Sequence, residues 1–123
     1  MTPAALGVAP VLCVSNMRET LDYFVERLGF SVQGTAGDLP SWASLHLDSV
    51  EIMLVCGNYP KPAQDWAAYI SVRNVDALYA EFQRRGVDLV GPPQDKPYGS
   101  REIEARLPDG RLLAFGESVD QPN

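Results

Sequence analysis

The sequence predicts an α+β domain in which two β-α-β-β-β modules form an open, eight-stranded, barrel-like sheet. Three observations support this fold class. Strand-like and helix-like segments follow one another in the same order twice along the 123 residues. Apolar and polar residues alternate within most strand-like segments, as they do in strands that bury one face. Near the end of the chain, Asp109 and Gly110 separate two such segments, and Asp-Gly is a strong signal for a tight hairpin turn.

The first module, at about 8–57, begins with a strand over 8–15 and continues into a helix. Asn16 can cap this helix, and Glu19 follows three residues later, as in a capping box. Apolar residues then recur at helical spacing until Gly29, which is typical of a helix C-terminus. These residues are Met17, Leu21, Phe24 and Leu28. Further strands are expected over 30–33, 41–47 and 50–56.

The second module, at about 66–118, repeats this order after the segment 57–65, which contains two prolines and has the composition of a linker. A strand over 66–72 leads to Asn74, which follows Asn16 by 58 positions (74 minus 16) and can cap a second helix. The same offset pairs Phe24 with Phe82 and Arg27 with Arg85. After this helix we expect a strand over 87–90, a Gly-Pro-Pro loop and the closing hairpin. Both modules belong to a single domain over 1–123.

Composition limits the functions that the chain can have. A net charge of −6 argues against nucleic acid and anionic membrane surfaces and is compatible with a cationic small molecule. The N-terminus lacks the features of a signal peptide, and no stretch approaches the roughly 18 apolar residues that span a membrane. We therefore expect a cytoplasmic protein without a membrane partner. Cys13 and Cys56 are too few for a disulfide framework or a zinc site and are expected to be small buried apolar residues.

Strand alternation also predicts which side chains face a cavity. One face of each sheet must cover its helix, which leaves the other face free. The side chains that alternation directs to the cavity are Ala9, Val11, Cys13, Trp42, Ser44, His46, Glu51, Met53, Val55, Ala67, Tyr69, Ser71, Glu102, Glu104, Arg106, Leu112, Ala114 and Gly116. A shift of one residue in the register of a strand would exchange its cavity-facing side chains for its core-facing ones.

The order of elements, together with the Pro-Asp-Gly turn before the last strand, resembles a known family along the whole chain. This is the glyoxalase/bleomycin-resistance/dioxygenase superfamily, also called the vicinal oxygen chelate superfamily. Its metal enzymes hold a divalent ion with four cavity-facing side chains, and the resemblance places these positions at Ala9, Met53, Ala67 and Ala114. Methyl groups have no lone pair, and a thioether suits soft ions only. The resemblance therefore implies a chain without the usual metal cofactor.

Three short segments resemble the bleomycin-resistance branch of this superfamily more closely. They are Val8-Ala9-Pro10-Val11-Leu12, Leu78-Tyr79-Ala80-Glu81, and Pro97-Tyr98-Gly99 followed, after Ser100, by Arg101-Glu102. Proteins of that branch bind their drug stoichiometrically, stack its flat rings between two aromatic side chains, and exchange an N-terminal arm between two protomers. The resemblance places the two aromatic positions at Trp42 and Tyr98, where tyrosine replaces the tryptophan of the branch.

We therefore expect a metal-free protein that sequesters a cationic aromatic drug or metabolite without turnover, as a homodimer with an exchanged N-terminal arm. The expected ligand-binding residues are Trp42, His46, Met53, Tyr69, Tyr98, Glu102 and Glu104. In the expected binding mode, the ring stacks on Trp42 and Tyr98. Its cationic group then points toward Glu102 and Glu104. The resemblance assigns no catalytic residue.

Each of these residues also has a structural interpretation, and the sequence leaves both open. Trp42 can be a core aromatic, Tyr98 can shape the loop beside Gly99, and the glutamates can belong to a solvated sheet face. His46 suits a polar cavity wall better than a catalyst. The second function that the sequence allows is a lyase, isomerase or dioxygenase-like enzyme of the same superfamily with a non-standard site. His46 and the cavity glutamates would then supply its acid-base or ligating groups.

Overall fold

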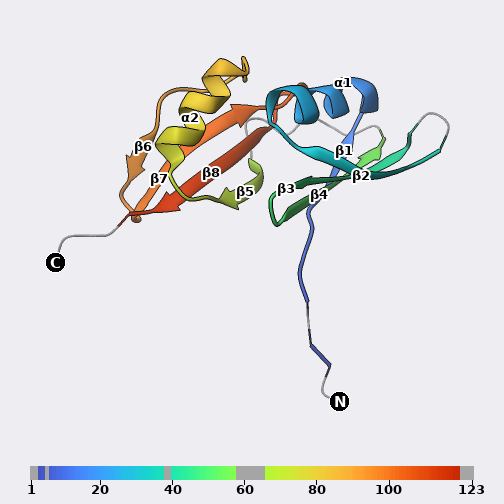
Figure 1. The fold of residues 1–123 in the computed structure, drawn as a ribbon, viewed down its shortest axis with the longest axis horizontal. Coiled ribbons are helices and arrows are strands. Elements are labelled where there is room, and N and C mark those ends of the chain that lie inside the picture. The colour runs from blue at the N-terminus through green and yellow to red at the C-terminus, as the bar shows by residue number, and fades with distance from the viewer. Residues whose placement is uncertain (1–2, 5, 38–39, 58–65, 120–123) are drawn as a thin grey trace.

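The computed structural model describes residues 3–4, 6–37, 40–57 and 66–119, and its elements fall into two four-stranded sheets, each with a helix on one face (Figure 1). The order strand, helix and three strands occurs twice along the chain. The structure confirms the predicted α+β fold of two β-α-β-β-β modules, and the sheets stay open rather than closing into a barrel. Among the described residues, no helix is long and apolar enough to cross a membrane.

The first sheet contains the N-terminal half of the chain. Its elements are β1 (Val11–Val14), α1 (Met17–Asp22), the π-helical turn η1 (Tyr23–Arg27), β2 (Ser31–Ala36), β3 (Trp42–Leu47) and β4 (Val50–Cys56). The strand order is β1-β4-β3-β2, with β1 parallel to β4 and the other pairs antiparallel. The side-chain oxygen of Asn16 accepts a hydrogen bond from the N–H of Glu19 at 3.0 Å, which confirms the predicted helix cap.

The second sheet repeats this arrangement. Its elements are β5 (Trp66–Ser71), α2 (Val75–Arg84), β6 (Gln94–Lys96), β7 (Ser100–Arg106) and β8 (Leu112–Ser118), in the order β5-β8-β7-β6. Asn74 caps α2 by accepting from the N–H of Ala77 at 3.2 Å. The carboxylate of Glu117, on β8, accepts from the N–H groups of Val75 and Asn74 at 3.0 and 2.7 Å. These bonds lower the pKa of Glu117 and tie the start of α2 to the sheet.

The prediction of a strand over 87–90 is wrong. In this segment only Leu89 forms a bridge, with Ala105 of β7, and the fourth strand of the sheet is β6 instead. Pro92 and Pro93 separate the two stretches that approach β7. Because proline has no N–H to donate, a continuous ladder cannot run through this pair.

The core is continuous between the two modules and agrees with the faces predicted by alternation. Phe24 and Phe30 pack edge to face with ring centroids 5.2 Å apart, and Phe82 and Phe115 do the same at 5.2 Å. The prediction that Cys56 packs inside is wrong, because it ends β4 at the margin of the sheet and is exposed. Cys13 is half-buried, and both thiols are free.

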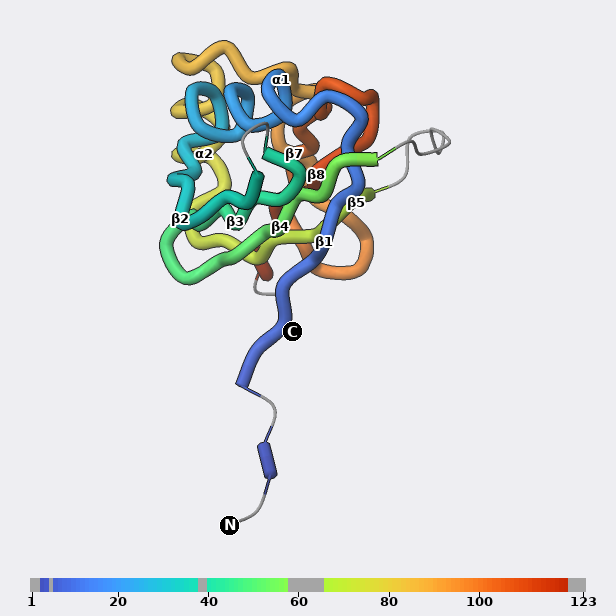
Figure 2. Tube along the Cα trace, turned by 90° about the vertical axis from the view of Figure 1, so that its right-hand side faces the viewer, coloured from blue at the N-terminus to red at the C-terminus, as the bar shows by residue number. Residues whose placement is uncertain are grey.

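The N-terminal arm, residues 6–10, extends away from the rest of the domain (Figure 2). Leu6 and Val8 are 97% and 94% exposed, and Val11, where the arm joins β1, is 56% exposed. An extended segment gains nothing from exposing large apolar side chains to water. The arm therefore leaves three large apolar side chains uncovered in the single chain.

Candidate functional site

The face of the second sheet that points away from α2 carries aromatic and carboxylate side chains. Glu102 and Glu104 alternate along β7 with the core residues Ile103 and Ala105, which places both carboxylates on this face. We call it the second-sheet face and define it by Trp66, Tyr69, Tyr98, Ser100, Glu102 and Glu104.

Tyr98 and Trp66 hold the two carboxylates of this face. The Tyr98 hydroxyl donates to the two carboxylate oxygens of Glu102 at 2.9 and 3.0 Å. The indole N–H of Trp66 donates to Oε2 of Glu104 at 2.7 Å. Neither carboxylate forms an ion pair within the part of the chain that the structure describes. The face therefore carries two negative charges that are held by neutral donors.

Glu102 is the more buried of the two carboxylates. It is 3% exposed, whereas Tyr98, which covers it from the β6–β7 turn, is 65% exposed. Desolvation and the hydrogen bond to Glu102 raise the pKa of Tyr98 above its ordinary value of 10.0. The phenol consequently remains a protonated donor at neutral pH.

Tyr69 lies across the strands of the same face. Its hydroxyl group is 2.7 Å from the hydroxyl oxygen of Ser100, and its ring lies 5.3 Å from the ring of Trp66 at an interplanar angle of 47°. The tyrosine lies directly over Gly116 of β8, where any Cβ atom would overlap its hydroxyl group. Glycine at this position therefore allows the phenol to reach across β8 to β7.

We expect Gly116→Ala to remove this arrangement. The added methyl group forces Tyr69 off the sheet, which breaks its contact with Ser100 and separates its ring from Trp66. Because Tyr69 is 42% exposed and can rotate into solvent, the fold should survive with a melting temperature lowered by a few degrees. A crystal structure or the near-ultraviolet circular dichroism of the variant checks this. Unchanged aromatic signals would contradict it.

The corresponding face of the first sheet, here called the first-sheet face, carries Trp42, Ser44, His46, Glu51 and Met53. Ser44 donates to Oε2 of Glu51 at 2.6 Å, and Nε2 of His46 lies 3.8 Å from the same oxygen. Trp42 is half-buried and packs over Gly34 of the neighbouring strand. This cluster contains a histidine-carboxylate contact, but its serine bonds to the carboxylate rather than to the histidine.

The seven predicted ligand-binding residues thus divide between two clusters, one on each sheet. On the second-sheet face, Tyr69 and Glu104 both contact Trp66, and Tyr98 contacts Glu102. Trp42, His46 and Met53 lie on the first-sheet face. Among the described residues, no ring contact and no hydrogen bond joins Trp42 to Tyr98. Their role as a pair of stacking surfaces stays a prediction.

Trp66 belongs to the second-sheet face and was missed from the sequence. Alternation selected Ala67 with Tyr69 and Ser71, but the pairing of β5 with β8 shifts between Trp66 and Ala68. This β-bulge places Trp66 against Tyr69 although the two are three residues apart, and Ala67 lies half-buried against the core. No residue in 66–68 is a glycine or proline that would mark the bulge.

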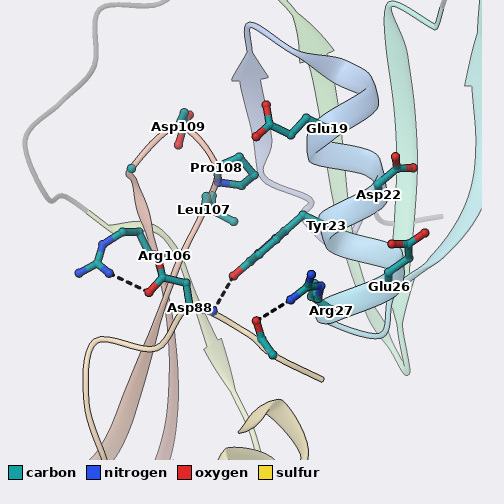
Figure 3. A pocket seen from close by; sticks show the side chains of 12 residues that line it. Glu19, Asp22, Tyr23, Glu26, Arg27, Asp88, Arg106, Leu107, Pro108 and Asp109 are labelled. Carbon is teal, nitrogen blue, oxygen red and sulfur yellow. Dashed lines mark hydrogen bonds and ion pairs between the residues drawn. The ribbon is translucent and has the colours of Figure 1, made fainter. Parts of the chain in front are cut away.

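Two grooves lie on the helix side of the molecule. One, of about 550 Å³, separates α1 from the β7–β8 turn (Figure 3). On its second-module side Arg106 pairs with Asp88 at 2.9 Å, and Arg27 of η1 donates across it to the carbonyl of Gly86 at 2.8 Å. Of its acidic helix residues, Glu19 was assigned from the sequence to the helix cap alone, and Asp22 and Glu26 were not singled out; their spacing also describes an ordinary solvated helix face. The other groove, of about 660 Å³, lies between the modules.

The positions that the resemblance assigns to metal ligands carry side chains that do not suit a hard or borderline metal ion. Met53 lies between Val11 and Ser44 in its sheet, and Ala114 lies between Tyr69 and Glu104 in the other. Within the described ranges, no group of three or more His, Cys, Asp or Glu side chains is placed to hold an ion. The donor chemistry of these positions therefore does not fit the superfamily's metal.

The fold and the open sheet faces identify the class of protein. A family model of the Glyoxalase/Bleomycin resistance protein/Dioxygenase superfamily matches residues 7–115, so the chain belongs to this superfamily. No curated protein matches the chain.

Several solved structures share its fold. A glyoxalase-related enzyme from Clostridium phytofermentans is 23% identical, with a TM-score of 0.80 over 95% of this chain and 98% of that one. The bleomycin-binding protein from Streptomyces verticillus, complexed with copper(II)-bleomycin, is 22% identical, with a TM-score of 0.75 over 98% and 100%. TnmS3, an antibiotic binding protein from Streptomyces sp. CB03234, is 22% identical, with a TM-score of 0.71 over 95% and 100%. Identities this low establish a common fold only.

Proposed function

We propose that the protein binds a small cationic aromatic drug or metabolite on the sheet faces that point away from its helices, and that it sequesters this ligand without a metal and without turnover. The observation that carries the proposal is the second-sheet face, where exposed aromatic rings surround two carboxylates that lack a cationic partner among the described residues. Aromatic surfaces and unpaired carboxylates are the groups that recognise a flat cation. Bleomycin- and antibiotic-binding proteins of the same fold support the ligand class.

The division of the predicted residues between the first-sheet face and the second-sheet face limits the ways in which such a ligand can bind. In the binding mode expected from the sequence, its ring stacks between Trp42 and Tyr98 while its charge points toward Glu102 and Glu104. Because Trp42 and Tyr98 lie on different sheets, this sandwich requires a first-sheet face opposite a second-sheet face. The two opposed faces can belong to the same chain or to two chains of a dimer.

A homodimer is the second part of the proposal. The apolar arm over 6–8 is almost fully exposed, and packing it against a second copy would bury Leu6 and Val8. Exchange of the same arm in both directions gives a symmetric pair. A cytoplasmic location is part of the same proposal, and two free thiols fit a reducing compartment.

An enzyme is the alternative, and one observation favours it. On the first-sheet face, His46 and Ser44 both approach the carboxylate of Glu51, so that an acid-base pair lies beside an open surface. This is the arrangement a lyase or isomerase would use on a vicinally oxygenated substrate. The hemithioacetal of methylglyoxal and glutathione tests this alternative. We expect no turnover, and a His46-dependent rate would favour the enzyme.

A thermal-shift screen tests the binding proposal. Native protein is purified without chelator and assayed for zinc, nickel, iron and manganese, of which we expect well below one equivalent. It is then heated with metal-free bleomycin, copper(II)-bleomycin and a set of cationic and neutral aromatic drugs. A ligand at 100 times its dissociation constant stabilises the fold by about 2.7 kcal/mol, which raises the melting temperature by several degrees. No shift with any cationic aromatic compound, or a tightly held equivalent of metal, would contradict the proposal.

A further inference from the structure

We infer that Trp66 and Tyr69 form the wall that receives the ligand's ring, and that Glu102, beneath Tyr98, receives its cation. This inference rests on the proposed function and adds to it a ring-binding residue, Trp66, together with a different role for Tyr98. It also defines the ligand more narrowly, as a planar ring that carries one compact cationic group at a fixed distance.

Trp66 and Tyr69 are aromatic side chains that the fold holds in place while their rings stay open to solvent. They are 46% and 42% exposed. Each has its polar atom bound by β7, the indole N–H by Glu104 at 2.7 Å and the phenol by Ser100 at 2.7 Å. Gly116 leaves the space in which Tyr69 lies. Side chains fixed in advance lose little conformational entropy when a ligand binds, so this pair is prepared to stack a ring.

Of the two carboxylates on this face, Glu102 is the one that a bound cation would stabilise more. Its side chain is almost completely buried, and within the part of the chain that the structure describes its carboxylate accepts hydrogen bonds from one neutral phenol alone. A buried carboxylate without a positive partner is unfavourable, and a ligand ammonium group would supply the missing charge. Tyr98 covers Glu102 from a turn and is itself largely exposed, so it can rotate away without disturbing the core. Tyr98 thus acts as a displaceable cover rather than as the main stacking surface.

The strand fixes the distance between ring and cation. The indole of Trp66 is held at Glu104, and Glu102 lies two residues away on the same face of β7. With a rise of about 3.3 Å per residue, the Trp66 indole, which forms one end of the ring wall, lies roughly 7 Å along β7 from Glu102. A primary arylalkylammonium ion with a linker of about three carbons spans this distance. The structure thereby narrows the ligand to this class of cation.

A matched pair of probes tests the inference. These are 3-(1-naphthyl)propylammonium and its neutral counterpart 3-(1-naphthyl)propan-1-ol, each titrated into native protein and followed by amide chemical shifts. We expect the native protein to bind the ammonium at least tenfold more tightly than the alcohol. Trp66→Leu should weaken both probes about tenfold, whereas Trp66→Phe should keep part of the affinity. Glu102→Gln should leave the alcohol unchanged and remove the preference for the ammonium.

The role of Tyr98 has its own variant and control. Tyr98→Phe keeps the ring but removes the hydroxyl that covers Glu102, so ammonium binding should be retained or tightened. Tyr79→Phe, which removes a tyrosine hydroxyl that bonds Gln83 on α2, is the matched control and should change nothing. Loss of ammonium binding in Tyr98→Phe would overturn the assignment of Tyr98 as a cover.

Two outcomes separate this inference from the proposed function. If Trp66→Leu and Glu102→Gln bind the probes and the ligand found by the thermal-shift screen as the native protein does, the inference is overturned. Loss of that ligand in Trp42→Ala would then leave the proposed function standing. If the native protein binds neither probe and no compound in the screen, the proposed function fails and the inference fails with it.

Discussion

Phe115→Ala is expected to lower the free energy of unfolding by roughly 3–5 kcal/mol, the range for removing a buried phenylalanine. Phe115 has no exposed surface and packs edge to face on Phe82, so the change empties a space between β8 and α2. The same core continues into the first module, and little can move to fill that space. Because domains of this size have total stabilities of about 5–15 kcal/mol, this loss is a large fraction of the stability of the fold.

Urea unfolding followed by the fluorescence of Trp42 and Trp66 measures the loss for Phe115→Ala. Phe115→Leu, which keeps most of the volume, is the matched control and should lose much less stability. The equivalent change in the first module, Phe24→Ala, should cost a similar amount because Phe24 is equally buried and packs on Phe30 in the same way. A loss below about 1 kcal/mol for Phe115→Ala would contradict the close packing of Phe115 between β8 and α2.

Removal of residues 1–8 is expected to convert a dimer into a monomer. The mass of one chain is 13.5 kDa, and light scattering should give about twice this value for the native protein and the mass of one shortened chain for the truncated one. The physical reason is the loss of the apolar area that Leu6 and Val8 would bury in the second copy.

Two substitution variants control for effects of the truncation on folding. Leu6→Ser combined with Val8→Ser keeps the length of the arm and should also dissociate the dimer. Val32→Ser changes an equally apolar residue, 44% exposed on the edge strand β2, and should leave the dimer intact. A native protein that already measures 13.5 kDa at low concentration would contradict the dimer, and a truncated protein that stays dimeric would show that the arm does not hold it.

Local rules in the sequence were sufficient to predict most of the fold. Asn16 and Asn74 cap their helices as their side chains suggest, and Asp109-Gly110 turns between β7 and β8. The faces of β3, β7 and β8 follow from a period of two because each strand has one face against the core. The segment over 87–90 has the same composition as a strand, but the two prolines after it end the pairing that composition alone would allow.

The candidate site was predictable where its residues follow that period or lie in a segment that resembles the bleomycin-resistance branch. Glu102 and Glu104 were found because they alternate with Ile103 and Ala105, and Tyr98 was found from the segment that resembles the bleomycin-resistance branch. Trp66 was missed because a bulge interrupts the alternation of β5, and a bulge depends on pairing with β8 rather than on β5 itself. The contact between Tyr98 and Glu102 likewise depends on the shape of the β6–β7 turn, and amino-acid composition does not specify that shape.

The location of the bound ligand is the most direct test of the central claim, that the open sheet faces are the binding site. The ligand found by the screen is titrated into isotopically labelled native protein, and amide shift changes are mapped onto the structure. We predict that the largest changes cluster on β5, β7, β8 and the turn around Tyr98, and that Glu102→Gln and Trp66→Leu reduce them. Changes concentrated instead along α1 and the β7–β8 turn, around the groove of about 550 Å³, would contradict the account and place the ligand on the helix side of the protein.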